Sequence, residues 1–168
     1  MAKKGTTKFK SNKQEKSVAK QMNAKTVIAS GALWFASADV RNDKFLMECK
    51  TTEKDFYSIT TKVWEKIALE ADKDGLRIPL LFVDLRDTDR YVVFNPNDFS
   101  MQVNTYEIVP HVHGGCKSYR FKGYTEEELP LLFSLVPVKM KKKNHILMVM
   151  KMSEFQKTFK EELEVEFE

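Results

Sequence analysis

Hydrophobic and polar residues alternate along residues 36–51, and this pattern predicts a pair of β-strands. The alternation is interrupted at Asn42-Asp43, which is typical of a two-residue hairpin turn, so we expect strands over about 36–42 and 44–51. Because side chains on a strand alternate between its two faces, one face of this pair is apolar and suited to packing against helices. That face carries Val40, Phe45, Met47 and Cys49.

The same turn predicts which residues of the two strands lie opposite each other. The opposed pairs are expected to be Arg41 with Lys44, Val40 with Phe45, and Asp39 with Leu46. Glu48 and Lys50 then share the face of Asp39, with Glu48 as its diagonal neighbour at roughly 7–8 Å between backbones. We therefore expect the carboxylates of Asp39 and Glu48 to reach the same cation.

The period of the apolar residues changes after Ser58, which predicts a helix followed by a buried strand. Ser58 is expected to cap the helix at its start and Gly75 at its end. The continuous apolar run at 78–84 then predicts a strand that is parallel to its predecessor, because a helix connects the two. The core is therefore expected to be α/β. The apolar residues that recur every fourth position in this helix are Ile59, Val63, Ile67 and Ala71.

The remaining segments are shorter, and no internal repeat or linker divides them. Around the paired strands we expect a helix at 12–22, a strand at 26–29, a strand at 91–94 and a turn or short helix at 95–98. Farther along we expect strands at 105–109, 119–121, 135–140 and 145–152, a basic hairpin tip at 141–144, and a helix at 153–163 capped by Ser153. One domain is the simplest organisation, with a flexible basic arm at 1–12, a core at about 13–100 and a β-rich C-terminal elaboration at about 101–168.

The face that carries Asp39 and Glu48 has the composition of a divalent-metal site. Converging carboxylates repel each other, which raises their pKa values unless a cation or a proton lies between them. Mg²⁺ prefers oxygen ligands, so the two carboxylates and the backbone carbonyl of Cys49 form a suitable partial ligand set. Lys50 can polarise an attacking water or neutralise charge on a phosphoryl group. The alternative is an ordinary surface ion pair, because exposed strand faces often carry alternating charges.

Several segments together show a resemblance to a known family. The segments are Ser30-Gly31-Ala32, Ala38-Asp39-Val40, the stretch from Phe45 to Thr52, a helix ending in Glu70-Ala71, and the strand at 79–83. In combination they resemble the PD-(D/E)XK nucleases, specifically the archaeal and phage Holliday junction resolvases, over about residues 12–86. The resemblance implies a restriction-endonuclease-like core, in which a mixed central sheet is flanked by helices.

The resemblance also implies roles for single residues. The family's metal ligands fall on Asp39 and Glu48, its lysine on Lys50, its first-helix glutamate on Glu15, and its strand-positioning serine on Ser30. One departure is Ala38, where the family usually has glycine. The implied activity is Mg²⁺-dependent cleavage of four-way DNA junctions by a homodimer, with Mn²⁺ able to substitute. A restriction-like or nicking endonuclease and a non-catalytic recombination accessory protein remain alternatives.

The charge distribution agrees with a nucleic-acid partner. The net charge is +4, yet residues 1–25 contain eight lysines and a single acidic residue. Lys8, Lys10 and Lys13 can neutralise DNA phosphates, which makes binding depend on salt. Lys62 and Lys66 lie four residues apart on the predicted helix and can contact a phosphate together. For both groups the alternative is a solvated surface, and for the arm a disordered tail.

The remaining composition sets the expected compartment. Two cysteines, Cys49 and Cys116, are too few for a disulfide framework, and no apolar segment has the length of a signal peptide core or a membrane span. We expect a cytoplasmic protein, in the host cytoplasm if a phage encodes it. A zinc site at His111, His113 and Cys116 is disfavoured, because these residues lack a second pair at zinc-finger spacing.

Overall fold

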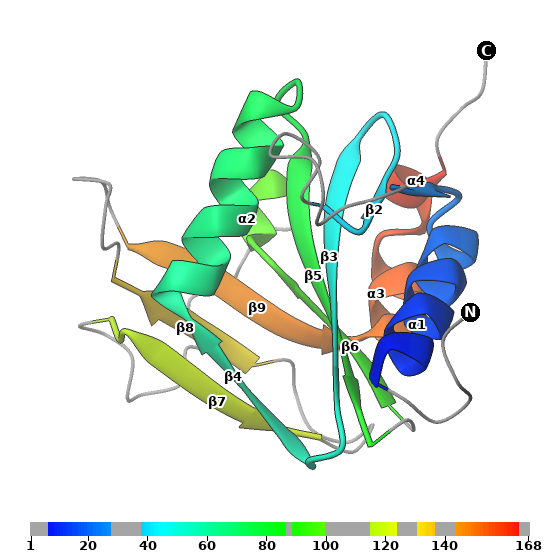
Figure 1. Cartoon of the computed structure of the whole chain (residues 1–168). Coiled ribbons are helices and arrows are strands. Elements are labelled where there is room, and N and C mark those ends of the chain that lie inside the picture. The colour runs from blue at the N-terminus through cyan, green and yellow to red at the C-terminus, as the bar shows by residue number, and fades with distance from the viewer. Residues whose placement is uncertain are drawn as a thin grey trace.

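The structure of the protein, a computed structural model, describes residues 7–27, 38–86, 89–99, 115–123, 131–136 and 144–164. Its centre is a seven-stranded sheet in the order β1-β2-β3-β5-β6-β9-β8, and β4 and β7 form a separate two-stranded sheet (Figure 1). The helices are α1 (Thr7–Gln21), α2 (Thr61–Lys73), η1 (Pro96–Asp98), α3 (Met152–Thr158) and α4 (Lys160–Leu163). The strands are β1 (Lys25–Thr26), β2 (Val40–Arg41), β3 (Phe45–Thr52), β4 (Phe56–Thr60), β5 (Ile78–Leu85), β6 (Asp89–Phe94), β7 (Ser118–Lys122), β8 (Leu131–Leu135) and β9 (His145–Lys151).

The central sheet is mixed, and its parallel pair is the predicted one. Strands β3 and β5 run parallel, with a register from Phe45↔Ile78 to Thr52↔Leu85. The other neighbouring strands of this sheet are antiparallel. The connection between β3 and β5 passes through β4 and α2, as a parallel pair requires a long crossover. The prediction of an α/β fold is confirmed as a mostly antiparallel sheet flanked by helices.

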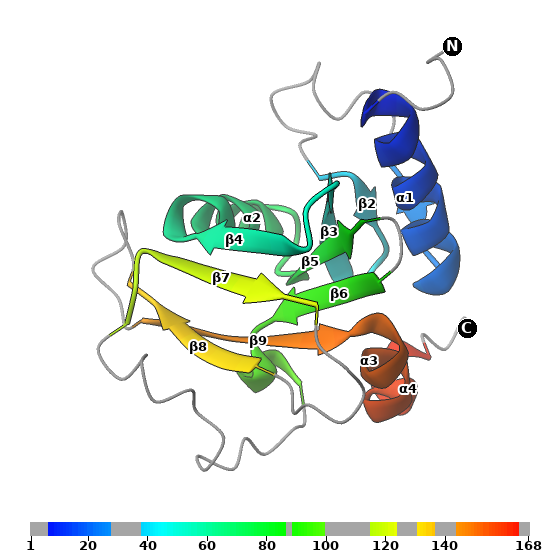
Figure 2. The same cartoon turned by 90° about the horizontal axis from the view of Figure 1, so that it is seen from below.

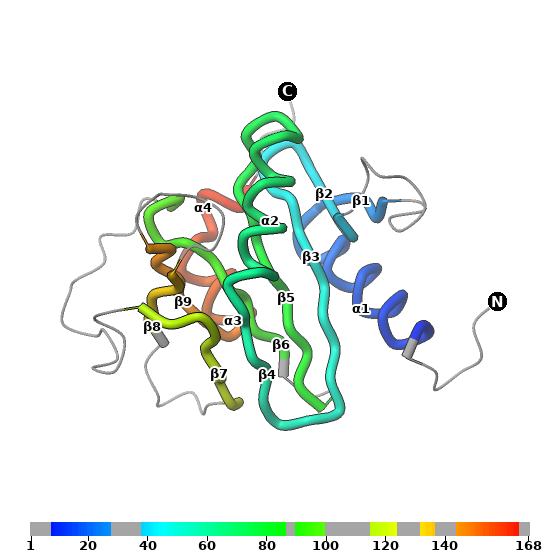
Figure 3. The backbone as a smooth tube through the Cα atoms, turned by 60° about the vertical axis from the view of Figure 1, so that its left-hand side comes forward, coloured from blue at the N-terminus to red at the C-terminus, as the bar shows by residue number. Residues whose placement is uncertain are grey.

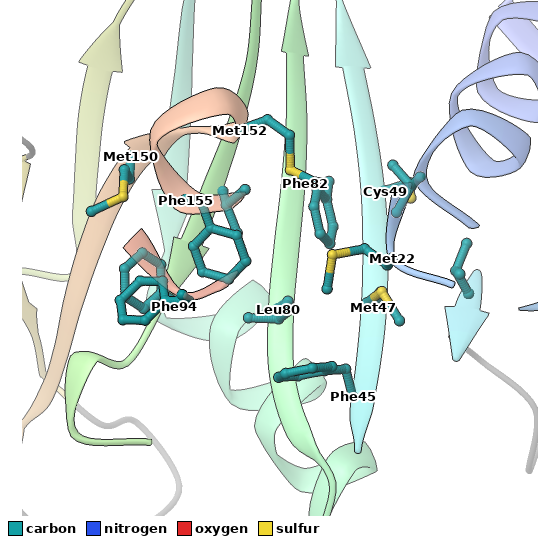
Figure 4. Close-up of a cluster of buried hydrophobic side chains, with 14 of the residues drawn as sticks. Met22, Phe45, Met47, Cys49, Leu80, Phe82, Phe94, Met150, Met152 and Phe155 are labelled. Carbon is teal, nitrogen blue, oxygen red and sulfur yellow. The ribbon is translucent and has the colours of Figure 1, made fainter. Parts of the chain in front are cut away.

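Each face of the sheet is covered by different elements, so the protein has two hydrophobic clusters. Helices α1, α3 and α4 cover one face, whereas α2 and the β4–β7 sheet lie on the other (Figure 2). The first cluster includes Met47, which lies near Met22 and Phe82 in Figure 4, and Phe94, which lies beside Phe155 in the same view. The second is built around Trp64 and Phe121. Both clusters contain residues of β3 and β5, so these strands are buried on both faces.

The hairpin differs from its prediction in register but not in its faces. Val40 pairs with Met47 and Arg41 with Leu46, which is a shift of two residues from the expected pairs. The turn is longer because the Asn42 side chain accepts hydrogen bonds from the backbone N–H groups of Lys44 (3.0 Å) and Phe45 (2.7 Å). A shift of two residues keeps Val40 and the residues of β3 on their predicted faces. Ala38 is the exception, because it lies in the second cluster whereas Val40 lies in the first. The apolar face accordingly joins the first cluster.

The start of α2 was predicted too early. Ser58 and Ile59 belong to β4, and the side chain of Thr60 caps the helix by accepting from the Val63 N–H at 3.2 Å. Ile59 is buried in a strand just as it would be in a helix. Its spacing from Val63 therefore could not distinguish a strand from the first turn of the helix. The end of the helix is confirmed, because Gly75 follows the cap with a φ of +83°, a conformation that glycine adopts without strain.

Both ends of the described chain also differ from the prediction. Helix α1 begins at Thr7, so Lys8 and Lys10 lie on a helix rather than in the expected flexible arm. The closing helix consists of α3 and α4, and Lys151 rather than Ser153 is its N-cap residue.

Strand β8 ends at Leu135, where the predicted strand began, and β8 and β9 extend the central sheet. The predictions for 105–109 and 141–143 lie outside the described residues. Within the described ranges no helix combines the length and apolar character of a membrane span.

A partly buried ion pair joins α1 to the sheet. Arg90 contacts both carboxylate oxygens of Asp84, at 2.7 and 2.9 Å, and also donates to Ser17 Oγ at 3.0 Å and to Gln21 Oε1 at 2.5 Å. The side chains of Arg90 and Asp84 are 15% and 17% exposed. Three side chains from β5 and α1 thus meet at the guanidinium of Arg90 on β6, which fixes α1 against β5 and β6.

We predict that Arg90→Met lowers the free energy of unfolding by about 2–3 kcal/mol, because it leaves the Asp84 carboxylate partly buried without its partner. The control is Lys160→Met, which breaks an exposed pair with Glu164 and should cost less than about 0.5 kcal/mol. Urea unfolding of both variants measures the difference. Equal costs would show that the Arg90 contacts do not hold α1 in place.

Candidate active site

Asp39 and Glu48 lie on neighbouring strands at the centre of the candidate site. Asp39 directly precedes β2, and its backbone N–H donates to the Met47 carbonyl at 3.2 Å. The pairing of β2 with β3 ends at Val40 with Met47, and because the Asp39 N–H also donates to Met47, Asp39 does not continue the regular ladder. Asp39 is nevertheless close to Glu48, whose charge acts on its pKa.

The Asp39 carboxylate is held in a position that disfavours its charge. Its Oδ2 accepts the backbone N–H of Cys49 at 2.8 Å. Burial and the charge of Glu48 raise the pKa of Asp39 from 3.8 to about 6, with a smaller upward contribution from Glu15 and opposing ones from the Cys49 N–H and Lys50. The carbonyl of Cys49 points to the same strand edge as its N–H, because both groups of a strand residue face the same neighbour.

Glu48 is almost completely buried, and only one of its oxygens has a partner among the described residues. Its Oε1 accepts from Lys50 Nζ at 2.7 Å, whereas its Oε2 is buried and accepts no hydrogen bond there. The residue is 6% exposed. Burial lowers the pKa of Lys50, but the hydrogen bond and the charge of Glu48 outweigh this effect and the net shift is upward. Lys50 is therefore a cation at neutral pH.

Two further residues contact the site and were not predicted from the sequence. Gln14 of α1 is 3% exposed, and its Nε2 donates to the backbone carbonyl of Lys50 at 2.7 Å. Its spacing of four residues from Val18 placed it on the buried face of α1 and could have identified it. Tyr57 of β4 lies near Lys50 and Glu48, whose charges act in opposite directions on its pKa, and burial raises that pKa. It was missed because β4 itself was missed.

Glu15 lies near the two carboxylates without joining them in one group. Its charge contributes to the raised pKa of Asp39, and its Oε1 accepts from Ser11 Oγ at 3.0 Å. Among the described residues no three His, Cys, Asp or Glu side chains gather closely enough to hold a metal ion. The metal-binding role of Glu15 therefore stays a prediction, and Asp39 and Glu48 are the two carboxylates that lie closest to each other at the site.

The predicted DNA-binding lysines are distributed over two helices. Lys8 and Lys13 are exposed on α1, and Lys10 of the same helix forms an ion pair with Glu53, in the turn after β3. On α2, Lys62 is exposed, and the Nζ atom of Lys66 lies 3.9 Å from Oε1 of Glu70. Ser30 lies outside the described residues. These lysines lie on both faces of the sheet, because α1 and α2 cover opposite faces.

Two other features are separate from the carboxylates. A cavity of about 560 Å³ lies at the opposite end of β3, against the hairpin turn, and Arg41, Asp74 and Arg77 are among its lining residues. Of the disfavoured zinc ligands, His111 and His113 lie outside the described residues. Burial raises the pKa of the Cys116 thiol, which donates to the Ser134 carbonyl at 3.4 Å. Neither feature contributes a group to the site at Glu48.

Comparisons with known proteins give a limited result. No protein-family model matches the chain, and no curated protein matches its sequence. A search of solved structures finds Hjc, a Holliday junction resolvase from the archaeal hyperthermophile Archaeoglobus fulgidus. The aligned part is 16% identical and covers 46% of this chain and 70% of that chain, with a TM-score of 0.39. Similarity at this level does not assign the chain to a fold family.

We predict that Asp39→Asn stabilises the metal-free protein at about pH 8 but has little effect near pH 4. Between the ordinary pKa of 3.8 and about 6, folded Asp39 keeps a proton that the unfolded chain has released. The stability of the wild type therefore falls as the pH rises through this range, and the uncharged variant avoids that loss. Urea unfolding in EDTA at both pH values measures it.

The control for this prediction is Asp43→Asn, which removes an exposed carboxylate from the hairpin turn. It should leave the stability nearly unchanged at both pH values. A stability gain for Asp39→Asn that does not depend on pH would show that the charge of Asp39 is not what destabilises the folded protein.

Proposed function

We propose that this protein is a metal-dependent DNA endonuclease with a restriction-endonuclease-like core. The observation that carries the proposal is the buried Glu48 carboxylate, which lies close enough to Asp39 for its charge to raise the Asp39 pKa, is paired with Lys50, and has one oxygen without a partner among the described residues. A buried acceptor of this kind is costly unless a further group binds it. A cation is the group that also relieves the repulsion between the two carboxylates.

The donor atoms at this place fit Mg²⁺, and Mn²⁺ as its substitute. Oxygen atoms are available from Asp39, from Glu48 and from the Cys49 carbonyl, and hard divalent cations prefer oxygen ligands. Mg²⁺ commonly binds one or two carboxylates and completes its coordination with waters and substrate phosphate oxygens, so a third carboxylate is not required. A cation held there supplies Lewis-acid charge to the phosphoryl group during hydrolysis.

The protein's own residues have distinct roles in the proposed reaction. Hydrolysis adds a water oxygen to phosphorus and breaks one phosphorus–oxygen bond of the DNA backbone. The Lys50 ammonium neutralises negative charge on the phosphoryl oxygens as it develops. Gln14 holds the backbone at Lys50 through its 2.7 Å hydrogen bond, which keeps that ammonium in place. Glu15 would bind or orient a second metal ion, and Ser30 positions the scissile strand.

Branched DNA, especially the four-way junction, is the proposed substrate. The support comes from the sequence segments that resemble junction-resolving nucleases and from lysines on both α1 and α2, which give cationic groups on both sides of the sheet. Phosphate contacts from such lysines position DNA without reading its sequence. An enzyme that recognises the shape of DNA needs such contacts on more than one side.

We predict that the protein nicks a labelled immobile four-way junction in Mg²⁺, and that Asp39→Asn and Glu48→Gln each reduce the rate by about 10²–10³ or more, because each removes a negatively charged ligand of the cation that stabilises the transition state. Asp43→Asn removes an exposed carboxylate close by in the chain and should cut at the wild-type rate. Denaturing electrophoresis of the labelled strands measures the rates.

A matched linear duplex distinguishes the substrate classes in the same experiment. Equal cutting of duplex and junction would indicate a restriction-like or nicking endonuclease rather than a junction resolvase. Junction binding without any cutting would favour a non-catalytic recombination accessory protein. Cutting that survives in Glu48→Gln would overturn the proposed site.

We also predict a homodimer, because two symmetric cuts at a four-way junction require two sites related by a twofold axis. Size-exclusion chromatography with light scattering, with and without a bound junction, measures the mass of the assembly. A monomer in both conditions would rule out paired cutting by one assembly while leaving single nicks possible.

A further inference from the structure

The two-stranded β4–β7 sheet has one buried face and one exposed polar face. Its antiparallel register pairs Phe56 with Lys122 and Ser58 with Arg120. The residues between them, Tyr57, Ile59 and Phe121, belong to or pack against the second hydrophobic cluster. Because side chains alternate, the outer face is formed by the remaining positions. These positions are Phe56, Ser58, Thr60, Ser118, Arg120 and Lys122.

Contacts on this outer face hold the cationic groups in defined positions. The Arg120 guanidinium lies over the Phe56 ring at 4.3 Å from the ring centroid, and its Nε donates to Ser58 Oγ at 3.3 Å. Lys54 Nζ lies 5.2 Å from the same centroid. Arg120 is nevertheless exposed. An exposed guanidinium whose plane is already oriented loses less conformational entropy when it binds a phosphate.

The charge of the outer face is of one sign. Residues 115–123 contain Lys117, Arg120 and Lys122 and no acidic residue. Arg120 and Lys122 lie two positions apart on one strand, which places their backbones about 7 Å apart. This separation is comparable to the distance between neighbouring phosphates along a nucleic-acid strand. Hydroxyl groups at Ser58 and Ser118 add the neutral donors that commonly contact phosphates.

The β4–β7 sheet is also placed beside the candidate active site. Strand β4 follows β3 after a short turn and leads directly into α2, as the tube in Figure 3 shows. The inner side of β4 brings Tyr57 close to Lys50 and Glu48. At the other end of β4, the Thr61 N–H donates to the Lys117 carbonyl at 2.9 Å, which places Lys117 beside the first turn of α2 and its exposed Lys62.

We propose that the outer face of the β4–β7 sheet is a phosphate-binding surface that holds the DNA backbone against the strand whose inner side carries Tyr57 toward the site at Glu48. This inference rests on the proposed function for its choice of DNA as the partner. Arg120 and Lys122 bind phosphates, and Phe56 and Ser58 orient Arg120. Lys117 and Lys62 extend the surface toward α2. The surface contributes affinity and position rather than sequence specificity, since it contacts the backbone.

The test is the double variant Arg120→Gln and Lys122→Gln in the full chain, with binding to a fluorescent four-way junction measured across a salt series. Loss of two phosphate contacts should make the slope of log K against log salt less steep by about 1.8, and should weaken binding by roughly tenfold or more near 0.1 M salt. The matched control is Lys157→Gln with Lys160→Gln, which removes two exposed charges on the opposite face of the sheet. Circular dichroism and thermal unfolding establish that both variants fold.

Different outcomes separate this inference from the proposed nuclease function. Weaker binding with a flatter slope in the Arg120 and Lys122 variant alone supports the surface, even if the protein never cleaves DNA. An unchanged slope in a protein that does cleave DNA overturns the surface and leaves the nuclease intact. Equal losses in both variants, or no DNA binding by the wild type, also overturn it.

Discussion

The parallel pairing of β3 with β5 is the constraint on which the rest of the structure depends. This pair is eight residues long and is buried on both faces, so the side chains of β3 must alternate between two hydrophobic clusters. Phe45, Met47 and Cys49 enter one cluster and Leu46 enters the other. Glu48 occupies a position where the alternation would otherwise place an apolar residue. A carboxylate fixed there loses most of its hydration, and the strand cannot shift by one residue to release it without exposing the whole apolar face.

The electrostatics of the site follow from that fixed position. Lys50 lies two residues farther along the same strand and neutralises part of the charge of Glu48. An ion pair alone would be an adequate structural reason for both residues. Asp39 changes this balance, because it adds a second, partly buried carboxylate whose pKa is raised to about 6. Two carboxylates with one ammonium leave a net negative charge in a half-buried place, which is an arrangement that costs stability unless a further cation binds. This cost is the physical reason to favour a cation-binding role for these residues over the role of a purely structural ion pair.

The faces of the strands could be predicted from the sequence, whereas contacts that depend on single side chains could not. Period-two alternation placed Glu48 and Lys50 on one face, and that result survives a register error of two residues and agrees with their ion pair at 2.7 Å. The alternation does not hold before β2, where Ala38 lies in the second cluster and Val40 in the first. The register itself depends on Asn42, whose side chain accepts two backbone hydrogen bonds and lengthens the turn. Strand β4 was not predicted because Ile59 also fits the four-residue spacing of the apolar residues in the following helix. Gln14 was overlooked because its partner is a backbone carbonyl, although its spacing of four residues from Val18 places it on the buried face of α1.

The positions of the cationic groups give the site a direction of approach for DNA. Lys10 of α1 forms an ion pair with Glu53, in the turn that joins β3 to β4, so α1 on one face of the sheet and the β4–β7 sheet on the other both reach the same end of β3. Lys50 lies near this end, between the two groups of cations. Positive charges on both sides of a half-buried negative site attract the phosphate backbone while the carboxylates repel it, and the repulsion decreases only when a divalent cation is present. Binding of DNA at this end and binding of metal at Glu48 are therefore expected to strengthen each other, because each relieves the charge that opposes the other.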